Sequence, residues 1–223
     1  RGPELVAHAS DDAGFGAPVV LMSFVEGAVE LTPGDLGRWL SRLAAELVAI
    51  HAHPAHGFGW QFKSWLDRST LAVPTWASQP APWQRAIEHV RRAPPTTSPV
   101  FLHRDYHPTN VLWQGEQLSG VVDWINACRG PAGVDIAHCR TNVCSMHGPD
   151  AADRFLEAYR AHGGAELDPY WDLESVLEMC LPEPRDYPPW RDFGLGPIDR
   201  ATLRQRSEAR LERAVRRLER ADS

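Results

Sequence analysis

Asp105, Asn110 and Asp123 are the side chains of this sequence whose types and spacing best suit chemistry. Asp105 lies two residues after His103 and five before Asn110. Asp123 ends an apolar run thirteen residues after Asn110. A positioned carboxylate can orient a hydroxyl group and accept its proton, whereas amide and carboxylate oxygens are ligands that Mg²⁺ prefers. Phosphoryl transfer needs little more than an aligned hydroxyl and a cation that bridges phosphates. The set predicts this reaction, with Asp105 as the catalytic residue and Asn110 and Asp123 as metal ligands.

The segments around these residues resemble the aminoglycoside phosphotransferase and small-molecule kinase family, distant relatives of the protein kinases. The resemblance is carried by 102–112 (LHRDYHPTNVL), 120–124 (GVVDW), 129–131 (RGP) and 135–137 (DIA). Many protein kinases have Lys two residues after the corresponding Asp, and His107 followed by proline is instead similar to antibiotic and metabolite kinases. The resemblance implies an α+β fold, the protein-kinase-like large (C-terminal) lobe, mainly helical with short strands around the catalytic loop.

The same resemblance implies supporting roles for three further residues. His103 is expected to pack beneath the catalytic loop and to hydrogen-bond backbone. Asp135 is expected to hold that loop through backbone N–H groups, and His107 either lines the substrate side or fixes the loop. Upstream, 21–27 (LMSFVEG) resembles the hinge that holds the adenine ring, so Met22, Ser23 and Val25 are expected to contact the base of ATP or GTP.

The first part of the chain differs from a complete kinase of this type. Such kinases carry a small lobe before the hinge, with a Gly-rich loop, a strand Lys and a helix Glu. Here about twenty residues precede the hinge, and the sole Lys is Lys63. We therefore expect 1–27 to be a remnant of small-lobe strands and hinge. Residues 28–223 form the large lobe, with the catalytic loop at 103–110 and acceptor-side helices within 135–220. The alternative is a non-catalytic remnant that binds a ligand or partner.

Composition narrows the remaining classes of function. The chain has 223 residues, is 43% hydrophobic and carries a formal net charge of −6, which argues against nucleic acid as the main partner. No apolar run approaches the roughly 18–20 residues that a membrane span needs. Four Cys without a C-x-x-C pair predict a reducing cytoplasm. Nothing in the sequence indicates the oligomeric state.

An acidic and aromatic stretch predicts the chemistry of the substrate. Residues 164–199 contain nine acidic residues, two arginines and five aromatic residues, namely Tyr170, Trp171, Tyr187, Trp190 and Phe193. Such a stretch suits a cationic, sugar-like acceptor, with Asp172, Glu174 and Glu178 as its ion-pair partners. Aminoglycoside-type antibiotics are therefore the leading acceptor class, and macrolides, choline and homoserine are the alternatives. A solvated acidic helix followed by a surface loop would give the same pattern.

Two groups of possible metal ligands have simpler interpretations. His51, His53 and His56 lie on different faces or beyond the end of a helix, where His is favoured by the helix dipole. The set His138, Cys139, Cys144 and His147 matches no common zinc spacing. Neither group predicts a zinc site.

Hydrophobic periodicity predicts the elements that position the site. Helices are expected at 36–50, 82–92, 135–144, 150–162, 168–180 and 202–220, and strands at 19–24, 100–102, 111–113 and 118–122.

Overall fold

Helix α1 (Leu36–His51) contributes one buried face to the main hydrophobic core. The computed structural model describes residues 2–10, 14 and 16–221. Asp35 caps α1 by accepting the backbone N–H of Arg38 at 3.0 Å. The apolar stripe of the helix, which includes Leu40 and Leu47, is completely or almost completely buried. The predicted amphipathic helix is therefore confirmed, and its stripe faces the core.

The remaining elements follow the expected order. The other helices are α2 (Pro80–Val90), α3 (Gly133–His147), α4 (Pro149–Ala161), α5 (Pro169–Cys180) and α6 (Arg200–Ala221). The strands are β1 (Leu5–Ala9), β2 (Val19–Met22), β3 (Ala28–Val29), β4 (Val100–Leu102), β5 (Val111–Gln114), β6 (Gln117–Val121) and β7 (Cys128–Gly130). Three short 3-10 helices, η1 (Pro108–Asn110), η2 (Trp124–Asn126) and η3 (Pro188–Phe193), complete the described elements. The predicted α+β class is confirmed.

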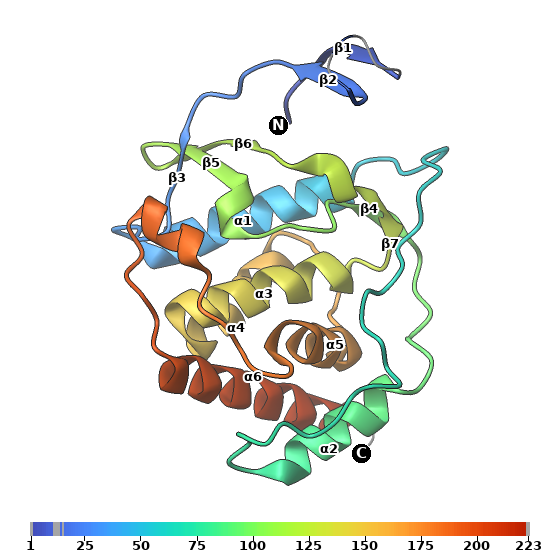
Figure 1. The fold of residues 1–223 in the computed structure, drawn as a ribbon, viewed down its shortest axis with the longest axis vertical. Coiled ribbons are helices and arrows are strands. Elements are labelled where there is room, and N and C mark those ends of the chain that lie inside the picture. The colour runs from blue at the N-terminus through green and yellow to red at the C-terminus, as the bar shows by residue number, and fades with distance from the viewer. Residues whose placement is uncertain (1, 11–13, 15, 222–223) are drawn as a thin grey trace.

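The strands form three small antiparallel sheets rather than one large sheet. These are β1–β2, β3–β5–β6 and β4–β7. Figure 1 shows the β1–β2 hairpin at one end of the molecule, apart from the helical body, with β5 and β6 next to α1. One continuous core runs through the helices from α1 to α6. The small sheets thus lie at the edge of a helical core, where they can hold loops.

The sequence missed strand β7 and understated the length of α3. β7 has only three residues, and it exists because it pairs with β4, a contact that no local pattern encodes. α3 is buried around most of its circumference, including the polar Arg140, Thr141 and Asn142. A helix that is buried on all sides shows little amphipathic period, so its ends cannot be placed from hydrophobicity. None of the helices in the described part of the chain has the length and apolar character needed to cross a bilayer.

A buried group of charges joins α3, α5 and α6. Asp172 of α5 is 0% exposed and accepts hydrogen bonds from Arg210 at 2.6 Å and from Arg140 and Arg217. The prediction that Asp172 contacts substrate is therefore wrong, because arginines surround this carboxylate inside the core. Asp153 gives Arg140 a second carboxylate partner at 2.6 Å.

We predict that Asp172→Asn lowers the free energy of unfolding by about 3–5 kcal/mol, because it leaves buried guanidinium groups without a matching charge. The matched control is Asp150→Asn, which removes an 87% exposed carboxylate paired with Arg213. This surface pair should be worth about 1 kcal/mol or less. Urea denaturation of both variants checks the difference. Equal, small losses for the two variants would mean that Asp172 does not join the helices.

Candidate active site

One buried carboxylate holds the loop 103–110, the predicted catalytic loop, against the helical core. Asp135, at the start of α3, accepts the backbone N–H of His103 with Oδ2 and that of Arg104 with Oδ1, both at 2.8 Å. His51 lies behind it, with its Nε2 3.4 Å from Oδ2 and its Nδ1 2.7 Å from the hydroxyl of Tyr159. Hydrogen bonds to a charged group are among the stronger ones in proteins. The first two residues of the loop are thereby fixed to the helical core.

His103 ties the same loop to the strand that precedes Asp123. Its Nε2 lies 2.9 Å from the carbonyl oxygen of Val122, and its Nδ1 lies 3.3 Å from the backbone nitrogen of Asp105. Burial lowers the pKa of His103, so the neutral ring prevails at neutral pH. The two partners fix the tautomer: Nε2–H donates to Val122 and Nδ1 accepts from Asp105. His103 thus contacts backbone on both sides.

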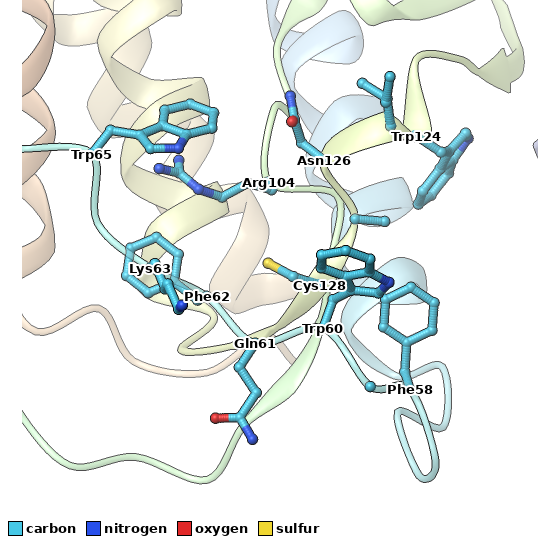
Figure 2. A pocket seen from close by; sticks show the side chains of 13 residues that line it. Phe58, Trp60, Gln61, Phe62, Lys63, Trp65, Arg104, Trp124, Asn126 and Cys128 are labelled. Carbon is cyan, nitrogen blue, oxygen red and sulfur yellow. The ribbon is translucent and has the colours of Figure 1, made fainter. Parts of the chain in front are cut away.

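Arg104 adopts a left-handed backbone conformation, with φ of 74°. A non-glycine residue in this region is uncommon and indicates a constrained position. Its guanidinium lies over the ring of Trp65 at 3.9 Å and over Phe62 at 4.8 Å, as Figure 2 shows. Oε1 of Glu178 lies 3.8 Å from Nη2 of Arg104. Glu178, predicted to bind substrate, therefore faces Arg104.

The aromatic residues around Arg104 belong to a large cavity of about 640 Å³ (Figure 2). Trp60 and Trp65 on its rim are 75% and 63% exposed. Asp105, the next residue along the loop, lines a different cavity. Consecutive residues of this loop therefore line two different cavities. Only the cavity lined by Asp105 contains the candidate catalytic carboxylate.

The carboxylate of Asp105 lies between two histidines. Its Oδ1 is 3.1 Å from Nε2 of His138 and 3.5 Å from Nε2 of His107. Hydrogen bonding from His107, and then from His138, holds the pKa of Asp105 far below its usual range, against the opposing effect of burial. An ionised carboxylate of this kind is a good hydrogen-bond acceptor and a weak base. It is thus better suited to orienting a hydroxyl group than to storing its proton.

Antiparallel pairing of β5 and β6 brings Asn110 and Asp123 to the same end of a hairpin. Val111 pairs with Val121, and the N–H of Val122 donates to the carbonyl oxygen of Asn110 at 2.9 Å. Asp123 follows directly, with φ of 65° and an exposed carboxylate. Asn110 comes directly before β5, so both residues flank the paired ends. The structure therefore places the two predicted metal ligands next to each other along this ladder.

The donor atoms of this pair fit Mg²⁺. The side chain of Asn110 donates through Nδ2 to the carbonyl oxygen of Asp105 at 2.9 Å, which leaves Oδ1 as an acceptor. Among the described residues, no donor is hydrogen-bonded to the carboxylate of Asp123. Mg²⁺ prefers oxygen ligands and usually takes one or two from protein, with phosphates and water as the others. An amide oxygen and a carboxylate at one hairpin end match that preference.

The predicted hinge connects to the sheet that carries Asn110. After the β1–β2 hairpin the chain enters β3, which pairs with β5 at Trp113 and Leu112. Met22 at the end of β2 is 53% exposed. The backbone N–H of Ser23 donates to the carbonyl oxygen of Glu4 at 2.8 Å, so this donor is already satisfied. Val25 is half-buried. Backbone contact with a base would therefore fall to Val25 or to the carbonyl of Ser23.

The cavity beside Asp105 has a volume of about 340 Å³. It is lined by Asp105, His107, His138, Asn142, Ser145, Met179, Cys180, Pro184, Arg185, Tyr187 and Trp190. Asp105 is the only carboxylate in this lining, and Arg185 is its one guanidinium. The cavity also lies between α3, the end of α5 and η3, so it is formed by the helices that were expected on the acceptor side.

The acidic stretch does not supply this cavity with carboxylates. Glu174 is 5% exposed and accepts from Ser64 at 2.9 Å and from Arg68 at 3.3 Å. Burial raises the pKa of Glu174. Neither Glu174 nor Glu178 lines the cavity beside Asp105, so the structure does not bring these two predicted substrate ligands together with the candidate catalytic carboxylate. Arginines from other segments neutralise these acids, which a count over one stretch of sequence could not reveal.

Two residues of the site were missed in the sequence. His138 was weighed only with its neighbours in sequence, although α3 turns it toward Asp105, thirty-three residues earlier in the chain. Arg185 enters the sequence analysis only through the net charge of the acidic stretch, whereas the structure places it in the lining of the cavity. His138 directly follows 135–137, the last segment of the family resemblance, and this position was the available signal. Arg185 lies in a proline-rich loop with no such signal.

A family model and curated relatives match this chain. The model of the phosphotransferase enzyme family matches residues 1–175. A homoserine kinase of Bradyrhizobium sp. (strain ORS 278) is 28% identical over 140 residues, which cover 58% of this chain and 42% of that protein. A homoserine kinase of Beijerinckia indica is 31% identical over 140 residues, covering 58% and 43%. The chain thus spans less than half the length of these two relatives in the matched region.

Solved structures show the same fold at low sequence identity. A putative aminoglycoside phosphotransferase from Ralstonia eutropha JMP134 is similar with a TM-score of 0.59, 15% identity, and coverage of 95% of this chain and 77% of that one. A thermostable mutant of aminoglycoside phosphotransferase APH(4)-Ia, in complex with ADP and hygromycin B, gives a TM-score of 0.56 at 16% identity, covering 96% and 76%. The predicted kinase-like fold is therefore confirmed. Because the family model covers well over half of its residues, this chain belongs to the phosphotransferase enzyme family.

Proposed function

We propose that this protein transfers the γ-phosphoryl group of ATP or GTP to a hydroxyl group of a small molecule. The observation that carries the proposal is that Asp105 lines a cavity and lies next to the Asn110–Asp123 pair that suits Mg²⁺. The membership of the phosphotransferase family and the ADP bound to one structural neighbour support a nucleotide as donor. The first 27 residues would contribute the hinge that contacts the base, and 28–223 would contribute the rest of the site.

Each of the site residues has a separate role in the proposed reaction. The acceptor hydroxyl donates a hydrogen bond to Asp105, which aligns its oxygen with the γ-phosphorus. As the new oxygen–phosphorus bond forms, the bond to the leaving nucleoside diphosphate breaks and the hydroxyl proton passes to Asp105 and then to water. Bound through Asn110 and Asp123, Mg²⁺ would neutralise charge on the phosphates. Asp135 and His103 keep the loop in place without touching either substrate.

The acceptor cavity favours a small molecule that carries a carboxylate. Its volume of about 340 Å³ is near the lower end for small-molecule sites. Arg185 can pair with an anionic group, whereas the lining offers a polycation no carboxylate besides Asp105. Among the acceptors considered from the sequence, homoserine has this character, and the curated relatives are named homoserine kinases. Aminoglycosides, named for the structural neighbours, remain the second candidate class; their support is the fold.

We predict that Asp105→Asn lowers kcat by about 10²–10⁴-fold and leaves nucleotide affinity nearly unchanged, because Asp105 acts on the acceptor hydroxyl. Asp123→Asn should weaken binding of the Mg²⁺-nucleotide as well as the rate. Asp192→Asn, at an exposed position outside the cavity, is the matched control and should behave as wild type. Steady-state kinetics with nucleotide titrations measure all three. Unchanged turnover in Asp105→Asn would contradict the proposed role, and nucleotide binding without any transfer would support a non-catalytic protein.

The acceptor class is tested by nucleotide consumption with aminoglycosides, macrolides, choline and homoserine. We predict turnover with homoserine or a related hydroxy acid, and a rise of about 10–100-fold in its KM in Arg185→Gln, since a charged hydrogen bond contributes about 1.5–3 kcal/mol. Arg191→Gln is the control, because Arg191 is exposed and paired with Asp186. Turnover confined to aminoglycosides, or equal KM values in both variants, would reject the anionic acceptor and leave phosphoryl transfer standing.

A further inference from the structure

One possible metal-ligand atom from each of three residues, Asp105, His107 and His138, lies close to the other two. The three atoms all lie within 4.8 Å of one another, and the two imidazole rings have their centroids 5.7 Å apart. His107 comes from the catalytic loop, whereas His138 comes from α3, which Asp135 joins to the same loop. Each of the three residues is half-buried. The group therefore combines two nitrogens and one carboxylate oxygen at a partly desolvated position.

The two separations from Asp105 are close to those of ligands around a tetrahedral ion. With metal–ligand bonds of about 2.0–2.1 Å, neighbouring ligands of a tetrahedral zinc ion lie about 3.3 Å apart, whereas an octahedral arrangement brings them to about 2.9 Å. The two separations from Oδ1 of Asp105 are 3.1 Å to His138 and 3.5 Å to His107. These two values lie on either side of the tetrahedral distance. All three ligand atoms lie within 4.8 Å of one another, so zinc binding would draw the two imidazole nitrogens toward the same ion.

His107 can offer its Nε2 to a metal ion because a partner is available for its other ring nitrogen. Nδ1 of His107 is 2.6 Å from the hydroxyl of Thr109. Without a metal ion, Nε2–H donates to the carboxylate of Asp105, 3.5 Å away. A metal ion would replace this proton between Nε2 and the carboxylate, with Nδ1–H donating to Thr109, which is the neutral tautomer that a metal requires.

We propose that Asp105, His107 and His138 form a binding site for Zn²⁺, distinct from the Mg²⁺ site at Asn110 and Asp123. Imidazole ligands suit zinc, whereas Mg²⁺ prefers oxygen donors, so the two sites select different ions. The cavity of about 340 Å³ next to the group gives access to a fourth ligand, such as water. One consequence rests on the proposed function: zinc on Asp105 occupies the oxygen that would accept the hydroxyl, and it inhibits phosphoryl transfer.

Co²⁺ is the probe for this site, because tetrahedral Co²⁺ absorbs visible light far more strongly than octahedral Co²⁺. Added to the full chain, Co²⁺ should give strong tetrahedral bands at one equivalent, and Zn²⁺ should abolish them. In His138→Gln, which keeps a side-chain N–H for Asp105 but removes the imidazole, the Kd should rise by about 100-fold or more. His107→Ala should have the same effect. His56→Ala, which removes an exposed imidazole elsewhere, should bind as wild type.

Three results would overturn the zinc site: no tetrahedral bands, equal affinity in His138→Gln and wild type, or a thiolate charge-transfer band that reveals binding by cysteine. Thermal unfolding of each apo variant shows whether lost affinity comes from lost structure. The inhibition is measured separately, as competition by Zn²⁺ against the acceptor and not against the nucleotide. If binding occurs but the wild type transfers no phosphate, the proposed function fails and the zinc site stands. If the wild type transfers phosphate but does not bind zinc, the zinc site fails and the proposed function stands.

Discussion

The two hydrogen bonds from the catalytic loop to Asp135 are the interaction on which the rest of the site depends. They fix the backbone of His103 and Arg104 to the start of α3, at 2.8 Å each. Because α3 also carries His138, the same helix positions both the loop and one side chain that contacts Asp105. His103 then links the loop to Val122, the residue before Asp123. The buried carboxylate of Asp135 therefore helps to fix the position of the candidate catalytic residue relative to the candidate metal ligands.

Charge in this protein is balanced across the fold rather than along the sequence. Asp172 of α5 pairs with arginines of α3 and α6, and Glu174 of α5 pairs with Arg68. These two acids are therefore buried ion-pair partners rather than a binding subsite for a cationic acceptor. The cavity beside Asp105 is left with one carboxylate and Arg185. This distribution explains how a locally acidic stretch can border a cavity that contains a single carboxylate.

The sequence predicted the long elements, and it supplied candidate residues for the site without every contact among them. Asp105, Asn110 and Asp123 could be proposed as a group because their spacing follows from one loop and one hairpin. The amphipathic stripe of α1 was identifiable because one face is buried and the other is not. β7, the surroundings of Asp172 and the approach of His138 to Asp105 each depend on pairing between segments far apart in sequence. Such contacts leave no period or spacing to recognise.

The most direct test of the account is a crystal structure with Mn²⁺ in place of Mg²⁺ and a non-hydrolysable nucleotide analogue. Anomalous scattering locates Mn²⁺ independently of the protein model. The account predicts a peak within bonding distance of Oδ1 of Asn110 and of the carboxylate of Asp123, with the terminal phosphate facing Asp105. A peak away from Asn110 and Asp123, or a nucleotide whose terminal phosphate lies away from Asp105, would contradict it.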